Sequence, residues 1–132
     1  MAVFRRRWPG LSYGRGEDWH YVGEAGEPAF ANSWVNAGPG QQLGFRIRES
    51  GIVDVQGVVK DGTVDAAVFT LPSDYRPSNI IDVPIVAYDL GASSWVAGLL
   101  TVNASGAVSA YISTNDEVHI TGQFFLDPAV AP

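Results

Sequence analysis

The side chains that most often carry chemistry are sparse in this sequence and poorly spaced for it. The two histidines, His20 and His119, lie far apart, and neither has a neighbouring histidine or aspartate at the spacing of a metal site. Asp82 and Asp89 flank an apolar segment, but a glycosidase needs two carboxylates that face each other across a groove. Such pairs arise by chance in any acidic β-protein, so this pair is weak evidence for hydrolysis.

Other motifs for catalysis or cofactor binding are also missing. Cysteine is absent, which excludes disulfides, cysteine–zinc sites and thiol catalysis. The segment 61–65 lacks the alternating oxygen ligands of a calcium loop, and neither a nucleophile elbow nor a phosphate-binding glycine loop occurs. We therefore expect no enzyme, no catalytic residue, no cofactor and no metal site within one chain. A histidine near the axis of a trimer would bring three imidazoles together, so a metal on such an axis stays open.

Charge is unevenly distributed along the chain. The net charge is −6, yet residues 1–16 contain four of the eight basic residues and no acidic one. This segment combines arginines with large apolar side chains: Phe4, Arg5, Arg6, Arg7 and Trp8. The pattern predicts an extended basic-aromatic arm that docks on an acidic neighbouring protein, and a tail without a partner is the alternative. The acidic remainder disfavours a nucleic-acid partner, and no apolar run is long enough for membrane insertion.

Residues 17–132 predict one all-β domain. From Leu43 onward, apolar residues recur at every second position in seven or eight short runs separated by turns. This pattern is typical of an antiparallel β-sandwich of the jelly-roll kind. The residues expected in its core are Val53, Val55, Phe69, Leu71 and Phe124.

The segment that precedes these runs, 17–40, is rich in glycine and proline. We expect irregular chain there, with a short strand near Trp34. Its aromatic residues are interpreted as core pegs and not as a ligand-stacking box: Trp19, Tyr21, Phe30 and Trp34. Further along, Pro84 indicates an edge strand or a bulge, since proline donates no ladder hydrogen bond.

The segment 95–102 is apolar on both faces of its predicted strand. A strand of this kind is usually buried on both sides, and in a small sandwich the second side meets another subunit. The candidate subunit-interface residues are Trp95, Val96, Leu100 and Val102.

The segment 69–77 predicts a stiff corner between two strands. Pro72 ends the incoming strand, and Arg76 is extended and held outward because Pro77 follows it. Tyr75 has a ring to bury and a hydroxyl that needs a partner. The structural motif residues are Phe69, Leu71, Pro72, Tyr75, Arg76 and Pro77. A rigid corner with a Tyr–Arg clasp and no chemistry is the favoured interpretation.

The same segment resembles the F-T-L-P-x-G-Y-R-P motif of small β-domains in phage minor tail and tail-fibre proteins. Asp74 stands where that family usually has glycine, and Asp tolerates the turn conformation well. The resemblance covers roughly residues 19–126. It implies a non-enzymatic virion protein, made in the host cytoplasm, that forms a homotrimer at the tail tip or tail fibre. Host attachment, through a glycan or receptor on the host surface, is the implied role.

Two alternatives remain open. The first is a trimeric capsid decoration protein anchored by the arm 1–16, because the chain is short and expected to be complete. The second is a carbohydrate-binding or glycan-degrading β-domain. An acid pair in a groove lined by tryptophan or tyrosine would support the second alternative.

Overall fold

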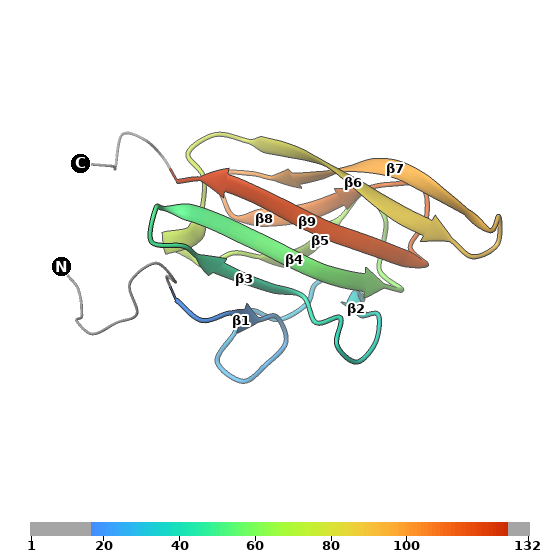
Figure 1. The fold of residues 1–132 in the computed structure, drawn as a ribbon, viewed down its shortest axis with the longest axis horizontal. Helices are drawn as coiled ribbons and strands as arrows, with labels where there is room; N and C mark the ends of the chain where they lie inside the picture. Colours follow the sequence, from blue (N-terminus) through green and yellow to red (C-terminus); the bar gives the residue numbers. More distant parts are fainter. Residues whose placement is uncertain (1–16, 127–132) are drawn as a thin grey trace.

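The computed structural model describes residues 17–126, and this part of the chain is all-β and antiparallel (Figure 1). The predicted arm, with Phe4, Arg5, Arg6, Arg7 and Trp8, lies outside the described residues. The described strands are β1 (His20–Tyr21), β2 (Val35–Asn36), β3 (Gly44–Ile47), β4 (Ile52–Lys60), β5 (Ala67–Thr70), β6 (Ile81–Asp89), β7 (Ser94–Val102), β8 (Ala107–Tyr111) and β9 (Glu117–Phe125). A short 3-10 turn, η2 (Ser73–Tyr75), follows β5. The predicted all-β class is confirmed, and no helix among residues 17–126 could span a membrane.

The strands form one sheet that curls into a sandwich-like half-barrel. Their order is β1-β3-β4-β9-β6-β7-β8-β5, and β2 pairs with β4 beside this path. Although β3 and β5 lie near opposite ends of this order, the rings of Phe45 and Phe69 are 5.7 Å apart. In Figure 1, β8 and β5 accordingly lie behind β9 and β4. The curl leaves one concave apolar side, which is the core, and one convex outer face.

The five core residues expected from the alternation are all buried. Each is at most 6% exposed: Val53, Val55, Phe69, Leu71 and Phe124. Trp34 joins this core and packs directly on Gly62, where a Cβ atom would lie 1.9 Å from the indole ring. Position 62 must therefore be glycine, because any side chain there would overlap the Trp34 ring.

Pro84 lies in the first half of β6, which pairs with β7 but not with β9. Strand β6 pairs with β7 along its whole length, but with β9 only from Val86 to Tyr88. Pro84 falls outside that second pairing, so its missing N–H removes no ladder bond with β9. Strand β6 is thus not an edge strand, because it lies between β9 and β7, but its first half, which holds Pro84, has no partner among the described strands on the β9 side.

The predicted subunit interface on β7 is wrong in its choice of face. Leu100 and Val102 are fully buried in the core of the single chain, and Val96 packs against that core. The exposed apolar side chains of β7 are Trp95, at 57%, and Leu99, at 44%. Because both faces of this strand are apolar, the alternation gave no information about which face points inward.

Candidate functional site

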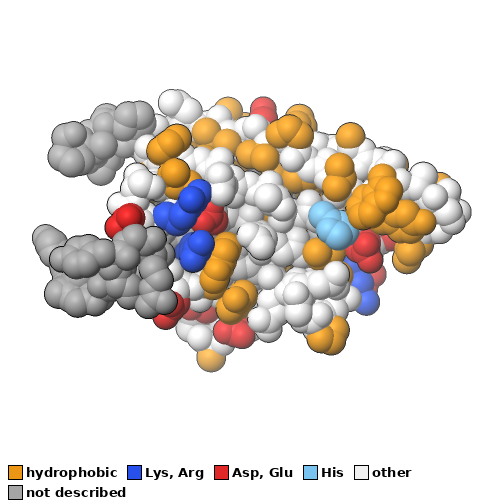
Figure 2. Space-filling model, viewed as in Figure 1, with side chains coloured by type: hydrophobic (Ala, Val, Ile, Leu, Met, Phe, Trp, Pro, Cys, Tyr) orange, Lys and Arg blue, Asp and Glu red, His pale blue; other side chains and the backbone are white. Residues whose placement is uncertain are grey.

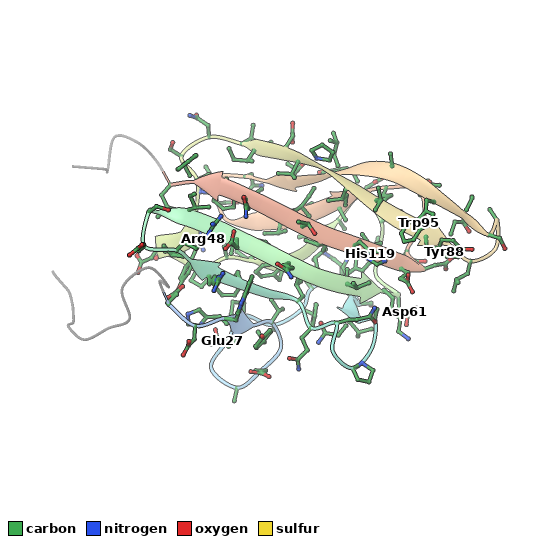
Figure 3. The ribbon with its side chains drawn as sticks, viewed as in Figure 1. Glu27, Arg48, Asp61, Tyr88, Trp95 and His119 are labelled. Carbon is green, nitrogen blue, oxygen red and sulfur yellow. The ribbon has the colours of Figure 1, made fainter. Side chains whose placement is uncertain are left out.

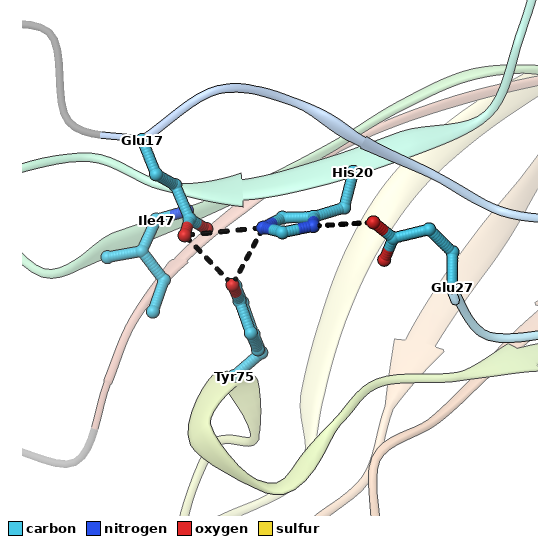
Figure 4. A network of polar contacts seen from close by, with 5 residues as sticks. All are labelled: Glu17, His20, Glu27, Ile47 and Tyr75. Carbon is cyan, nitrogen blue, oxygen red and sulfur yellow. Dashed lines mark hydrogen bonds and ion pairs between the residues drawn. The ribbon is translucent and has the colours of Figure 1, made fainter. Parts of the chain in front are cut away.

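Tyr75 in η2 lies at the centre of a polar network that joins four parts of the chain (Figure 4). Its hydroxyl donates to Glu17 Oε1 at 2.9 Å and lies 3.1 Å from His20 Nε2. The other oxygen of Glu17 accepts the backbone N–H of Ile47 at 2.8 Å. His20 Nδ1 is 2.8 Å from Glu27 Oε2. The network therefore fastens the segment before β1 to β3 and to the corner.

The same network shifts the pKa values of His20 and Tyr75. The pKa of His20 is raised, chiefly by its hydrogen bond with Glu27 and further by Glu17, although partial burial opposes the shift. The pKa of Tyr75 is raised above its ordinary value by burial and by Glu17. His20 also stacks on Phe45, with 5.3 Å between ring centroids, and Tyr75 meets the same ring edge-on at 5.0 Å. A phenol held in its neutral form and an imidazole between two carboxylates therefore form a structural clamp.

Pro72 and Pro77 take the structural roles expected of them, whereas two expectations for Arg76 are wrong: it is not held outward, and it forms no clasp with Tyr75. Pro72 caps η2 and accepts the N–H of Tyr75 at 3.0 Å, and Pro77 is buried. Arg76 turns back onto its own corner, where Nε donates to the carbonyl of Leu71 at 2.8 Å. Tyr75 and Arg76 thus have separate partners, and the expected Tyr–Arg clasp is not formed.

A groove of about 470 Å³ crosses the outer face of β4 and β9. Its walls combine aromatic rings with uncharged polar side chains: Trp19, Tyr21, Gln41, Gln42, Gln56 and Thr121. The lining of this groove, as far as the structure describes it, contains no Asp, Glu, Lys or Arg. The middle of the same face shows mostly uncharged surface in Figure 2.

Strand register creates the groove. Tyr21 pairs with Gly44, Gly44 with Gln56, and Gln56 with Thr121, so the four residues form one row across β1, β3, β4 and β9. Gly44 adds no side chain to this row, and the Tyr21 ring lies over it, 3.0 Å from where a Cβ atom would be. A glycine inside a strand often marks such a close approach.

A second glycine brings the glutamines to the groove wall. A Cβ atom at Gly57 would lie 2.4 Å from the Cα of Leu43 and 2.7 Å from the carbonyl oxygen of Gln42. The chain before β3 therefore lies directly against β4, where Val58 N–H donates to the carbonyl of Gln41 at 3.1 Å. Only glycine at position 57 permits this crossing.

Trp19 is held in place from one side of its ring. The guanidinium carbon of Arg46 lies 4.6 Å from the ring centroid, a cation–π contact. Arg46 is in turn paired with the buried Asp54 at 3.3 Å, and Arg48 pairs with the same carboxylate at 3.1 Å. The interpretation of Trp19 and Tyr21 as core pegs is therefore wrong, because both are half-exposed groove residues.

The other rim of the groove carries a second aromatic cluster (Figure 3). His119 lines the groove, and its ring lies 5.2 Å from that of Trp95, which lies 5.1 Å from Tyr88. His119 Nε2 is 3.1 Å from Glu117 Oε1, which orients the imidazole. Of the predicted interface residues, only Trp95 thus remains on the surface as a large apolar side chain.

The acid pair considered from the sequence lies away from this groove. Asp82 accepts a hydrogen bond from the Thr101 hydroxyl at 2.9 Å, and Asp89 accepts the N–H of Ala92 at 3.1 Å. Neither aspartate lines the groove. Within residues 17–126, no three His, Asp or Glu side chains gather as a metal site would require.

No family model matches the chain, and no curated protein matches it.

Proposed function

We propose that this protein is a non-enzymatic structural protein of a phage virion, of the minor tail, tail-tip or tail-fibre type, and that it acts in host attachment. The observation that carries the proposal is the groove beside β4 and β9, which is open and aromatic and whose lining within residues 17–126 includes no Asp, Glu, Lys or Arg. Ligand sites typically combine aromatic walls with a few polar groups that fix orientation. The resemblance of the corner 69–77 to phage tail domains adds the virion context.

The chemistry of the groove favours binding over bond cleavage. A hydrolase of glycans needs a carboxylic acid to protonate the leaving oxygen and a second carboxylate as base or nucleophile. The described lining offers neither of these groups. Asp82 and Asp89 lie outside the groove, where they accept hydrogen bonds from the Thr101 hydroxyl and the Ala92 N–H. Glu117, which contacts the groove residue His119, does not line the groove and is paired with that imidazole.

The second candidate function is a carbohydrate-binding domain outside a virion, because the same groove would serve it. The decoration-protein alternative depends on the arm 1–16 and therefore lies outside the described residues. Labelling of intact particles with an antibody against this protein separates the three functions. We expect label at the tail end, whereas label over the capsid would indicate a decoration protein.

A competition experiment tests the attachment role itself. Purified protein, added to host cells before the phage, should slow phage adsorption because it occupies the same surface structures. Protein heat-denatured before addition is the control. If no particle carries the label, the virion assignment is refuted. If the tail is labelled but the purified protein does not slow phage adsorption, the attachment role is refuted.

A further inference from the structure

We propose that the groove on β4 and β9 binds an uncharged oligosaccharide through Trp19, Tyr21 and the glutamines of its wall. The inference rests on the proposed function in one respect: that function identifies the host surface as the source of the glycan. Binding itself is a property of the isolated domain and is independently testable.

Apart from His119, which pairs with Glu117, the polar side chains of the groove are available to bind a ligand. Among residues 17–126, no side-chain hydrogen bond engages the groove's amides and hydroxyl: Gln41, Gln42, Gln56 and Thr121. Each amide offers one acceptor and two donors, and the threonine hydroxyl is both donor and acceptor. Sugar hydroxyls also donate and accept, so an array of neutral amides matches them without any ionised group.

The aromatic walls suit the faces of sugar rings. A pyranose presents C–H groups on its faces, and these carry the weak positive charge that the negative π face of an aromatic ring attracts. Trp19 is fixed by Arg46 and Tyr21 by Gly44, so both rings are pre-positioned before a ligand arrives. Pre-organisation of this kind lowers the entropic cost of binding.

The charges around the groove favour a neutral glycan over an anionic one. Arg46, which lies against Trp19, and Arg48 are both paired with Asp54. The net charge of −6 would further repel sialic acids, uronic acids and phosphate-bearing polymers. A ligand with its own negative charge would find no free cation in the described lining.

The extent of the aromatic surface indicates a chain of sugars. Tyr21 on β1 and Trp95 on β7 are separated by five strand steps, and His119 lies between them. At about 4.8 Å per strand, that path measures up to about 24 Å along the sheet. Trp95, at 57% exposure, offers a second ring at the far rim. A single monosaccharide would leave most of this surface unused.

The test is a binding panel of immobilised neutral oligosaccharides, with sialylated and uronic-acid oligosaccharides beside them. The full-length protein should bind members of the neutral set. Gln56→Ala and Trp19→Ala should each weaken that binding about tenfold or more, equivalent to about 1.4 kcal/mol. The matched control is Gln123→Ala, because Gln123 lies on the same face of β9 but outside the groove, and its binding should be unchanged.

The alternative outcomes are decisive. Binding confined to anionic glycans, neutral binding that survives Gln56→Ala and Trp19→Ala, or no binding across the panel would each overturn the inference. Gln56 is exposed, so its truncation leaves the fold intact even if loss of Trp19 does not. Tail labelling and adsorption competition without glycan binding would refute the inference alone. Glycan binding without label on particles would refute the virion assignment alone.

Discussion

His20 is an imidazole held between two carboxylates, and this placement makes stability depend on pH. Its pKa is raised above the ordinary 6.5, first by Glu27 and then by Glu17. A raised folded-state pKa stabilises the fold fully below the unfolded value, and that contribution is lost as the pH rises through the folded value. The protein should therefore lose stability as the pH rises above about 6.5.

Thermal melts of the protein and of His20→Gln check this prediction. The melting-temperature difference between them should be larger at about pH 6 than at about pH 9. His119→Gln is the control and should preserve the pH dependence assigned to His20. A difference that stays constant with pH would contradict the role given to the Glu27–His20–Glu17 cluster.

Tyr75 contributes both a ring and a hydroxyl, and two substitutions separate them. Tyr75→Phe keeps the ring against Phe45 and loses the bond to Glu17, which should cost about 1 kcal/mol of unfolding free energy. Tyr75→Ala also loses the packing and should cost about 2–3 kcal/mol, below the value for a fully buried aromatic residue. Urea unfolding measures both, and equal costs would show that the ring contributes nothing.

At the level of elements, the contact of Gly62 with Trp34 gives a sharp prediction. Gly62→Ala would place a methyl carbon 1.9 Å from the Trp34 ring, which is far inside van der Waals contact. The substitution should therefore lower the free energy of unfolding by about 3 kcal/mol or more, the upper end of the usual cost of overpacking. Gly91→Ala is the matched control, because the added methyl would have only an ordinary contact 3.5 Å from Asp89. Similar melting temperatures for the two variants would contradict the packing described.

The alternation of apolar residues was enough to predict the long strands and their buried side chains. Val53, Val55 and Phe124 are in the core because a period of two places them on one face, whatever the strand order. The buried face of β7 could not be predicted in this way, because Leu99 and Leu100 lie on opposite faces and are equally apolar. Which of the two is buried depends on the side of the sheet on which the core lies.

The groove could not be predicted from local sequence. It exists because β1, β3, β4 and β9 align Tyr21, Gly44, Gln56 and Thr121, and this register depends on pairings between distant segments. Glutamines in a polar segment carry no signal of a site. Gly44 and Gly57 were the local sign, because a glycine within a strand indicates a close approach of other atoms.

At the level of the whole molecule, we predict a homotrimer. The exposed apolar side chains Leu99 and Tyr111 are partners across β7 and β8, and we propose them as the subunit contact in place of the buried Leu100 and Val102. Light scattering at micromolar concentration should give three times the chain mass of 14.1 kDa. Leu99→Asp should produce folded monomers, whereas Leu100→Asp should unfold the chain. A monomeric mass for the unmodified protein would refute the prediction.

The arm 1–16 stays a prediction about assembly. Deletion of these residues should leave the melting temperature nearly unchanged, because Glu17, which fastens β3 and Tyr75, would be retained. The deletion should abolish incorporation into particles, and Arg5, Arg6 and Arg7 changed to Glu should weaken it by reversing the attraction to an acidic surface. Normal incorporation of the shortened protein would show that the arm has no partner.

The position of β9 in the sheet has a consequence for the order of events during synthesis. Strand β4 pairs along nearly its whole length with β9, the last of the described strands, although β5 to β8 intervene in the chain. The hairpins β6–β7 and β7–β8 need only neighbouring residues and can form early on the ribosome. The backbone N–H and C=O groups of β4 that pair with β9 have no strand partner until the segment 117–125 has emerged. Folding should therefore be completed late and slowly, as expected for a topology dominated by distant strand pairs.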